Sequence, residues 1–293
     1  MIGRRHARFP AGDRSRRTRW SGILGLAIAV TAVPSSVAAR TAWPGKARAA
    51  IVLTYDDALV SQLDHAIPAL DAAGLKATFF LSGVRQADVA RWRAVASHGH
   101  ELGNHTIFHP CAAATYPADP HYTAEAYTPA TMLREIAAQN VLLSALDGKS
   151  RHAFATPCGQ TVAGGADYLG PLAASRLVTS VRGVSATPAD LAVDGATRDV
   201  MHIPGRGFAE HTTGEQLIAY ARQAEAGGGI AVFLFHGIGG DHLAISNEAH
   251  RALINWLRSH KRDVWTTTLS KALAWEATHQ RGPFDAKHPA SRR

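Results

Sequence analysis

Two adjacent carboxylates, Asp56 and Asp57, are the first residues of this chain whose position suggests chemistry. They end the segment 51–57, whose apolar residues are typical of a buried β-strand. Neighbouring carboxylates repel each other and are costly to desolvate unless a metal ion, a proton or a positive side chain offsets their charge. The alternative is a solvated turn, because Asp is also a common turn residue.

A histidine pair, His105 and His109, follows another short strand expected over residues 100–103. A spacing of four places both imidazoles on the same side of a helical turn, where both can bind one ion. With an oxygen from Asp57, this gives two His and one carboxylate, a ligand set found in catalytic Zn, Fe and Co sites. The pair alone does not establish such a site, because the chain contains 16 His.

Two further polar segments follow predicted strands. His236 comes directly after the apolar residues 230–235, and residues 154–159 leave a strand through Pro157 and Gly159. In isolation a hydrogen-bonded structural role explains His236 better than a catalytic one. All four features nevertheless fall at the carboxyl ends of predicted strands, where barrels of parallel strands build their active sites.

The order of the expected elements indicates an α/β protein with a mainly parallel sheet, because about eight strands alternate with about seven helices. Helices are expected over residues 131–146 and 214–226, and a long loop over 104–128. Residues 182–199 resemble a loop between strands at 177–181 and 200–203. Composition does not change between residues 40 and 281, so we predict one domain followed by a flexible tail at 282–293.

The first 39 residues have the pattern of an export signal. An Arg-rich start precedes an apolar run over residues 22–33, and Val37 and Ala39 fit the small-residue cleavage pattern. We therefore expect a periplasmic or secreted protein with no stable membrane span after cleavage, or an N-terminally anchored one if the signal is not cleaved. The formal charge of +8 falls to +2 without these residues, which hold seven Arg and one Asp. A nucleic-acid partner is therefore not indicated.

The chain has two cysteines, Cys111 and Cys158. An oxidising compartment would allow one bridge between them, whereas a reducing one would leave free thiols. Their spacing does not decide between these alternatives.

Four segments resemble the motifs of the polysaccharide deacetylases, carbohydrate esterase family 4. These segments are residues 54–57 (Thr-Tyr-Asp-Asp), 105–109 (His-Thr-x-x-His), 157–159 (Pro-Cys-Gly) and 234–236 (Leu-Phe-His). The resemblance covers roughly residues 48–270. It implies a distorted (β/α) barrel in a single domain and a hydrolase that removes acetyl groups from sugars.

The resemblance also implies a role for each site residue. Asp57, His105 and His109 would bind a divalent metal, with zinc the expected ion and cobalt, nickel or iron the alternatives. Asp56 would be the general base and His236 the general acid.

The resemblance adds two expectations about the cysteines. The backbone N–H of Cys158 would stabilise the oxyanion. Cys111 and Cys158 would lie at the same rim, so a bridge between them would fix the long loop to the site. A thiolate ligand to the metal is the alternative.

The sequence departs from the family pattern at two places. Ala155 occupies the position of an Arg that pairs with the catalytic Asp, so Arg182 or Arg206 must be considered as a replacement. The alternative for each arginine is a solvated charge in a loop. The Asp that tunes the catalytic His has no clear match, although Asp241 is a candidate, with an ordinary turn residue as the equal alternative. His98, His100, His242 and His250 are expected to be structural or surface residues.

We predict an exported, metal-dependent deacetylase acting on N-acetyl or O-acetyl groups of an acetylated glycan. Two alternatives stay open from sequence. One is an amidase or esterase for a small non-sugar acyl compound. The other is a glycan-binding protein that has kept its metal and lost turnover.

Overall fold

The structure is a computed structural model that describes residues 43–115, 119–185 and 198–279. The predicted signal and the predicted tail both lie outside these described residues. Among the described helices, none is both long and apolar enough to cross a membrane.

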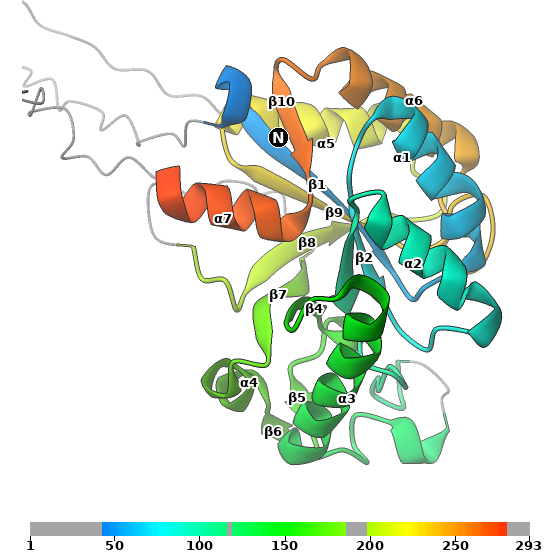
Figure 1. Ribbon diagram of the computed structural model, residues 1–293, viewed down its shortest axis with the longest axis vertical. Coiled ribbons are helices and arrows are strands. Elements are labelled where there is room, and N and C mark those ends of the chain that lie inside the picture. The colour runs from blue at the N-terminus through cyan, green and yellow to red at the C-terminus, as the bar shows by residue number, and fades with distance from the viewer. Residues whose placement is uncertain (1–42, 116–118, 186–197, 280–293) are drawn as a thin grey trace, which may run out of the picture. The chain divides into compact units, whose positions relative to one another are not determined.

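Seven parallel strands form a closed barrel (Figure 1). In barrel order they are β1 (Ala49–Asp56), β2 (Thr78–Leu81), β3 (Glu101–Asn104), β4 (His152–Ala155), β7 (Val178–Ser185), β8 (Ile203–Gly207) and β9 (Ile230–Phe235). Pairing of β9 with β1 closes the barrel. An eighth strand, β10 (Val264–Thr267), lies beside the first half of β1, and β2 takes its place beside the second half. The predicted fold class, a distorted barrel of mainly parallel strands, is confirmed.

Helices flank the barrel. They are α1 (Ile67–Ala73), α2 (Val89–Ser97), α3 (Pro129–Asp147), α4 (Leu169–Ser175), α5 (Gly214–Gly227), α6 (Asn247–Ser259) and α7 (Leu269–His279). A π-helical segment, Gln62–Ala66, precedes α1, and a small hairpin pairs β5 (Val162–Ala163) with β6 (Ala166–Asp167). The helices predicted at 131–146 and 214–226 are confirmed as α3 and α5, and each begins at a threonine capping box.

Alternating residues of β1 divide the core into two parts. Ile51, Leu53 and Tyr55 pack outward with the helices, whereas Ala50 and Val52 pack inside the barrel. This alternation follows from the period of two along a strand. It places the next inward residue after Thr54 at Asp56, so the carboxylate enters the barrel at its carboxyl end.

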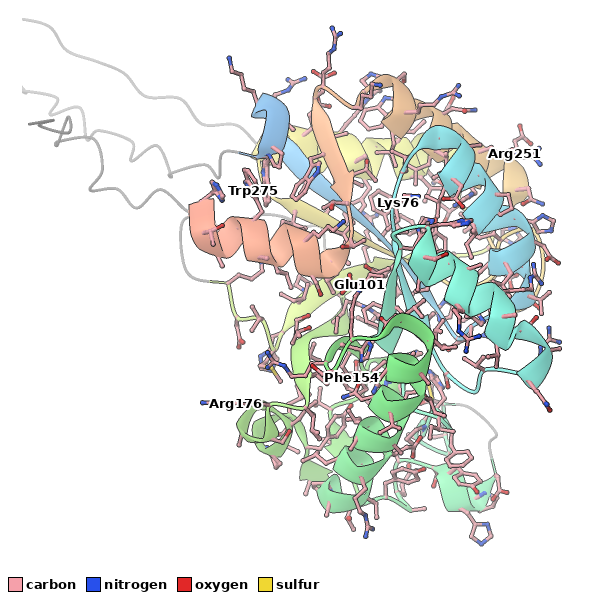
Figure 2. All side chains as sticks on the ribbon, in the orientation of Figure 1. Lys76, Glu101, Phe154, Arg176, Arg251 and Trp275 are labelled. Atoms are coloured by element: carbon pink, nitrogen blue, oxygen red, sulfur yellow. A yellow bond between two sulfur atoms is a disulfide. The ribbon has the colours of Figure 1, made fainter. Side chains whose placement is uncertain are left out.

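Apolar side chains close the amino end of the barrel. Residues of α7 belong to the same buried cluster as the inward residues of β1. Glu101, labelled in Figure 2, fixes the start of this helix. Its carboxylate accepts hydrogen bonds from the Thr78 hydroxyl at 2.8 Å and the Ser270 backbone N–H at 3.1 Å. With that end closed, the carboxyl ends of the strands form the open mouth.

Two predicted boundaries were wrong. Residues 182–185, expected in a loop, continue β7, which pairs with β8 through Arg182 and the three residues after it. The strand expected at 200–203 begins at Ile203 and extends to Gly207. Arg182 followed by Gly183 does not resemble a strand locally, and the pairing of β7 with β4 and β8 decides its conformation.

Candidate active site

The sequence-predicted residues lie at the mouth of the barrel. Asp56 is the last residue of β1, and Asp57 follows it with a left-handed φ of 77°. His105 follows β3, and His236 follows β9. Strand geometry therefore brings together side chains that are as much as 180 positions apart in the sequence.

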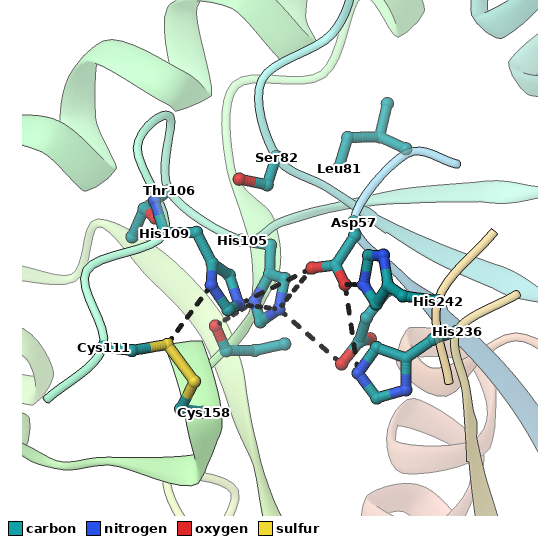
Figure 3. A network of polar contacts seen from close by, with 12 residues as sticks. Asp57, Leu81, Ser82, His105, Thr106, His109, Cys111, Cys158, His236 and His242 are labelled. Carbon is teal, nitrogen blue, oxygen red and sulfur yellow. Dashed lines mark hydrogen bonds and ion pairs between the residues drawn. A yellow bond between two sulfur atoms is a disulfide. The ribbon is translucent and has the colours of Figure 1, made fainter. Parts of the chain in front are cut away.

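Three of these side chains converge closely enough to bind one cation. The Nε2 atoms of His105 and His109 are 3.0 Å apart, and each lies 3.5 Å from Oδ1 of Asp57 (Figure 3). His105 Nδ1–H donates to the carbonyl of Ala155 at 2.8 Å, which leaves the lone pair of the neutral ring on Nε2. The trio thus offers one oxygen and two nitrogen donors that suit a divalent metal such as zinc.

The two histidines do not lie on a helical turn, as their spacing suggested. Thr106 and His109 have left-handed φ values of 61° and 52°, and the segment forms an irregular turn. Glu135 of α3 holds this turn by accepting hydrogen bonds from two of its backbone N–H groups at 2.8 and 2.7 Å. The His109 N–H donates to the Thr106 hydroxyl at 3.0 Å. Contacts with a distant helix therefore set the turn that aligns both imidazoles.

Asp56 is paired with Arg182, one of the two cations considered as a replacement for the family Arg. Nη2 of Arg182 donates to both carboxylate oxygens of Asp56, at 2.6 and 2.5 Å, and the arginine is fully buried. Its guanidinium lies 5.1 Å from the centre of the Phe80 ring. Arg182 is the register partner of Ala155, so the cation comes from the neighbouring strand at the same level. Gly205 leaves room for it, because a Cβ there would lie 2.5 Å from Cδ of Arg182.

Arg206 and Asp241 do not take the places suggested for them. The guanidinium of Arg206 lies over the rings of Tyr220 and Phe208, at 4.7 and 5.4 Å from their centres. The Asp241 carboxylate accepts a hydrogen bond from the Ser61 backbone N–H at 2.7 Å. Among the described contacts, Asp241 has none with the His236 side chain, so it does not tune that imidazole directly.

His236 faces the site from the opposite strand end. Its Nε2 atom is 3.9 Å from Oδ2 of Asp57. Burial lowers the pKa of His236 below its ordinary value, although the charges of Asp56 and Asp57 act in the other direction. The side-chain amide of Gln62 donates to the backbone carbonyls of Asp56 and His236, at 2.5 and 3.0 Å. Gln62 therefore links the ends of β1 and β9, a role that local sequence did not indicate.

A disulfide joins Cys111 to Cys158, as expected from the resemblance. Sγ of Cys111 lies 3.4 Å from Nδ1 of His109, so the bridge packs against the imidazole (Figure 3). Because both sulfurs are in the bridge, neither can be a thiolate ligand. Cys158 has a left-handed φ of 51° in the turn after β4.

Sequence reasoning missed His242, which was expected to be structural or on the surface. Its Nε2–H donates to Oδ2 of Asp57 at 2.8 Å, while its side chain is 57% exposed. Burial alone would raise the pKa of Asp57, but the hydrogen bond from His242 and the nearby imidazoles lower it below its usual range. The glycine-rich run at 237–240 was the available signal, because it indicated a tight turn returning toward His236.

Comparison with known proteins gives a family match over part of the chain. Residues 45–167 match the family model described as polysaccharide deacetylase. The predicted resemblance to the polysaccharide deacetylases is confirmed. The matched residues include Asp56, Asp57, His105 and His109, whereas Arg182 and His236 lie beyond them. No curated protein matches the chain.

Solved structures of polysaccharide deacetylases resemble the barrel at low sequence identity. The peptidoglycan deacetylase PdaC from Bacillus subtilis shares 17% identity with a TM-score of 0.51, covering 78% of this chain and 92% of that one. The Bc1960 peptidoglycan N-acetylglucosamine deacetylase shares 19% identity with a TM-score of 0.50, covering 79% and 90%. A family 4 acetyl xylan esterase from Clostridium thermocellum, in complex with cobalt, shares 20% identity with a TM-score of 0.49, covering 78% and 91%. At these identities, the first two similarities establish the fold.

Proposed function

We propose that this chain is a metal-dependent deacetylase that removes N-acetyl or O-acetyl groups from an acetylated polysaccharide or oligosaccharide. The observation that carries the proposal is the convergence of Asp57, His105 and His109 beside the buried Asp56. The family match to polysaccharide deacetylases supports a glycan as the molecule that carries the acetyl group.

In this proposal Asp57, His105 and His109 hold the ion, and the hydrogen bond from His105 to Ala155 fixes the ring in its metal-binding tautomer. A divalent ion held there would polarise the acetyl carbonyl and lower the pKa of a water molecule. Zinc suits the two nitrogen donors and one oxygen donor, and cobalt, nickel and iron share that preference.

Asp56 and His236 carry the protons in this proposal. The Asp56 carboxylate, 3.6 Å from His105 Nε2 and outside the ligand trio, takes a proton from the water that attacks the acetyl carbon. The bond to the sugar nitrogen or oxygen then breaks, and His236 gives a proton to the departing amine or alcohol. The lowered pKa of His236 makes its imidazolium a better donor. The backbone N–H of Cys158 is the proposed oxyanion donor.

The test is acetate release from acetylated chitin, xylan and peptidoglycan fragments by purified residues 40–293. We expect release that a chelator stops and added divalent metal restores. Asp56→Asn is expected to bind metal normally and lose about 10²–10⁴-fold in rate. Asp64→Asn is the matched control, because Asp64 is a half-exposed carboxylate paired with Arg91. Metal-loaded protein that releases acetate only from small non-sugar acyl compounds, or from none, would contradict the proposal.

We also propose that residues 1–39 are an export signal, 40–281 the single catalytic domain and 282–293 a tail. The export pattern and the disulfide both support a periplasmic or secreted location. Mass analysis of the protein recovered from the medium or periplasm should give an N-terminus at Arg40. Retention in the membrane with Met1 intact would indicate an uncleaved anchor.

A further inference from the structure

We propose that His242 is a positioning residue that holds Asp57 in the orientation needed to bind the metal. The inference rests on the metal site of the proposed function and adds a residue that lies outside the ligand trio. His242 is not a catalytic group in this proposal, because it acts through Asp57.

The two carboxylate oxygens of Asp57 face different partners. Oδ1 lies 3.5 Å from Nε2 of both His105 and His109, whereas Oδ2 accepts a hydrogen bond from Nε2–H of His242 at 2.8 Å (Figure 3). With Oδ2 engaged, rotation of the carboxylate is restricted and Oδ1 stays directed at the imidazoles. His242 therefore favours binding of the metal through one oxygen.

The backbone around Asp57 explains why such a constraint matters. Asp57 and Ala58 both have left-handed φ values, of 77° and 54°, so the chain turns sharply as it leaves β1. A backbone hydrogen bond from the Asp57 N–H to the Phe80 carbonyl, at 3.0 Å, holds the residue to the neighbouring strand. The side chain leaves a turn, where strand pleating no longer sets its direction.

The loop that carries His242 is built rigidly. Ile238 and Ile245 form a parallel bridge, and the Gly237 N–H donates to the His242 carbonyl at 3.2 Å. Gly237 admits no side chain, because a Cβ there would lie 2.0 Å from the Gly240 carbonyl oxygen. The loop thus folds back on itself closely, which restricts the backbone conformation at His242.

The backbone conformation of this loop and its contacts with Ser61 also restrict the position of His242. The residues on either side of His242, Asp241 and Leu243, have left-handed φ values of 63° and 48°. Ser61 fastens the loop to the segment after β1, since its N–H donates to Asp241 at 2.7 Å and its hydroxyl accepts from the Ile238 N–H at 3.1 Å. Strained backbone held by its surroundings is characteristic of functional sites. Here it presents one exposed imidazole to the second oxygen of Asp57.

The experiment measures metal affinity, independently of turnover. Cobalt(II) and zinc(II) dissociation constants are measured for the metal-free wild-type chain, His242→Ala and His242→Gln by competition with a chelating dye. We expect His242→Ala to weaken both affinities by about 10–100-fold, the usual effect of losing a partner that orients a ligand. His242→Gln, whose amide can donate to Oδ2, should recover most of that loss. Urea unfolding of each metal-free variant should show one cooperative transition, which establishes that the chains compared are folded.

His202→Ala is the matched control. His202 donates to the Asp199 carboxylate at 2.7 Å and is 64% exposed, so it reproduces the pair away from the site. Equal affinities for wild type and His242→Ala would overturn the inference and leave the proposed function standing. Loss of one nitrogen ligand from the cobalt complex of His242→Ala, measured by X-ray absorption spectroscopy, would also overturn it, because His242 would then be a direct ligand. A wild-type chain that binds no divalent ion would overturn both.

Discussion

Arg182 provides the most demanding test of the site, because its pairing with Asp56 can be removed and rebuilt from another strand. In Arg182→Ala the Asp56 carboxylate would remain buried without its cation. The two side chains are 0% and 3% exposed, so the carboxylate would lose its charge partner in a largely desolvated position. Breaking one side of a buried pair costs about 3–5 kcal/mol of unfolding free energy. Urea unfolding of the metal-free protein at pH 7.5 measures this loss.

The rebuilt pair is Ala155→Arg combined with Arg182→Ala. Because Ala155 and Arg182 are register partners on adjacent parallel strands, an arginine at either position starts from the same level of the barrel interior. We expect the double variant to recover at least half of the lost stability and to restore acetate release. Ala155→Arg alone should be destabilising, since it puts two cations beside one carboxylate.

Gly205 supplies an independent check of the same geometry. Gly205→Ala would place a Cβ 2.5 Å from Cδ of Arg182, an overlap that should cost about 1–3 kcal/mol. In the Arg182→Ala background that overlap is absent, so the cost should fall. A loss below about 1 kcal/mol in Arg182→Ala, or equal costs of Gly205→Ala in both backgrounds, would refute the account of the buried pair.

Two further predictions concern stability. Replacing Cys111 and Cys158 by Ser should lower the unfolding free energy by about 4 kcal/mol, because the bridge closes a separation of 47 residues. It should also weaken zinc affinity, because the His109 imidazole loses its contact with the bridge. An unchanged urea midpoint would contradict the first expectation. Burial lowers the pKa of His250 to about 3, against about 6.5 in the unfolded chain. Between these two pH values the imidazole is protonated in the unfolded state and neutral in the folded state. The unfolding free energy therefore falls as the pH falls. From pH 8 to pH 5 the loss is about 2 kcal/mol, or 1.5 pH units at about 1.4 kcal/mol each. His250→Gln, which can still accept from the Tyr55 hydroxyl, should lose that much less over the same range, and equal losses would contradict the assignment.

The barrel and the likeness to the deacetylases could be predicted because their signals are local. Apolar runs such as residues 230–235 fix buried strands, and polar residues directly after them must lie at one end of a parallel barrel. The positions of Asp57 and His105 follow from that rule, because each comes directly after a strand, β1 or β3. The conformation of the histidine turn does not, because Glu135 of a distant helix sets it.

The partner of Asp56 could be named only as one of two arginines. Locally, Arg182 and Arg206 are alike, since each is a charged residue beside glycine in a segment with weak strand character. Burial separates them, because arginine is rarely inside a protein unless it is paired. Which of the two reaches the carboxylate depends on strand register, and register is a property of the closed barrel.

Arg182 also shows why no single sequence position predicts the partner of Asp56. A small residue at Ala155 leaves the interior open on β4, Gly205 leaves it open on β8, and Arg182 on β7 fills the space between them. Each of the three residues is explained only by the other two. Losing the family Arg at one position therefore does not imply a loss of turnover, provided that the guanidinium reaches Asp56 by another strand. Because the charge and its contact with the carboxylate are kept, we expect turnover to require an arginine paired with Asp56, whichever strand carries that arginine.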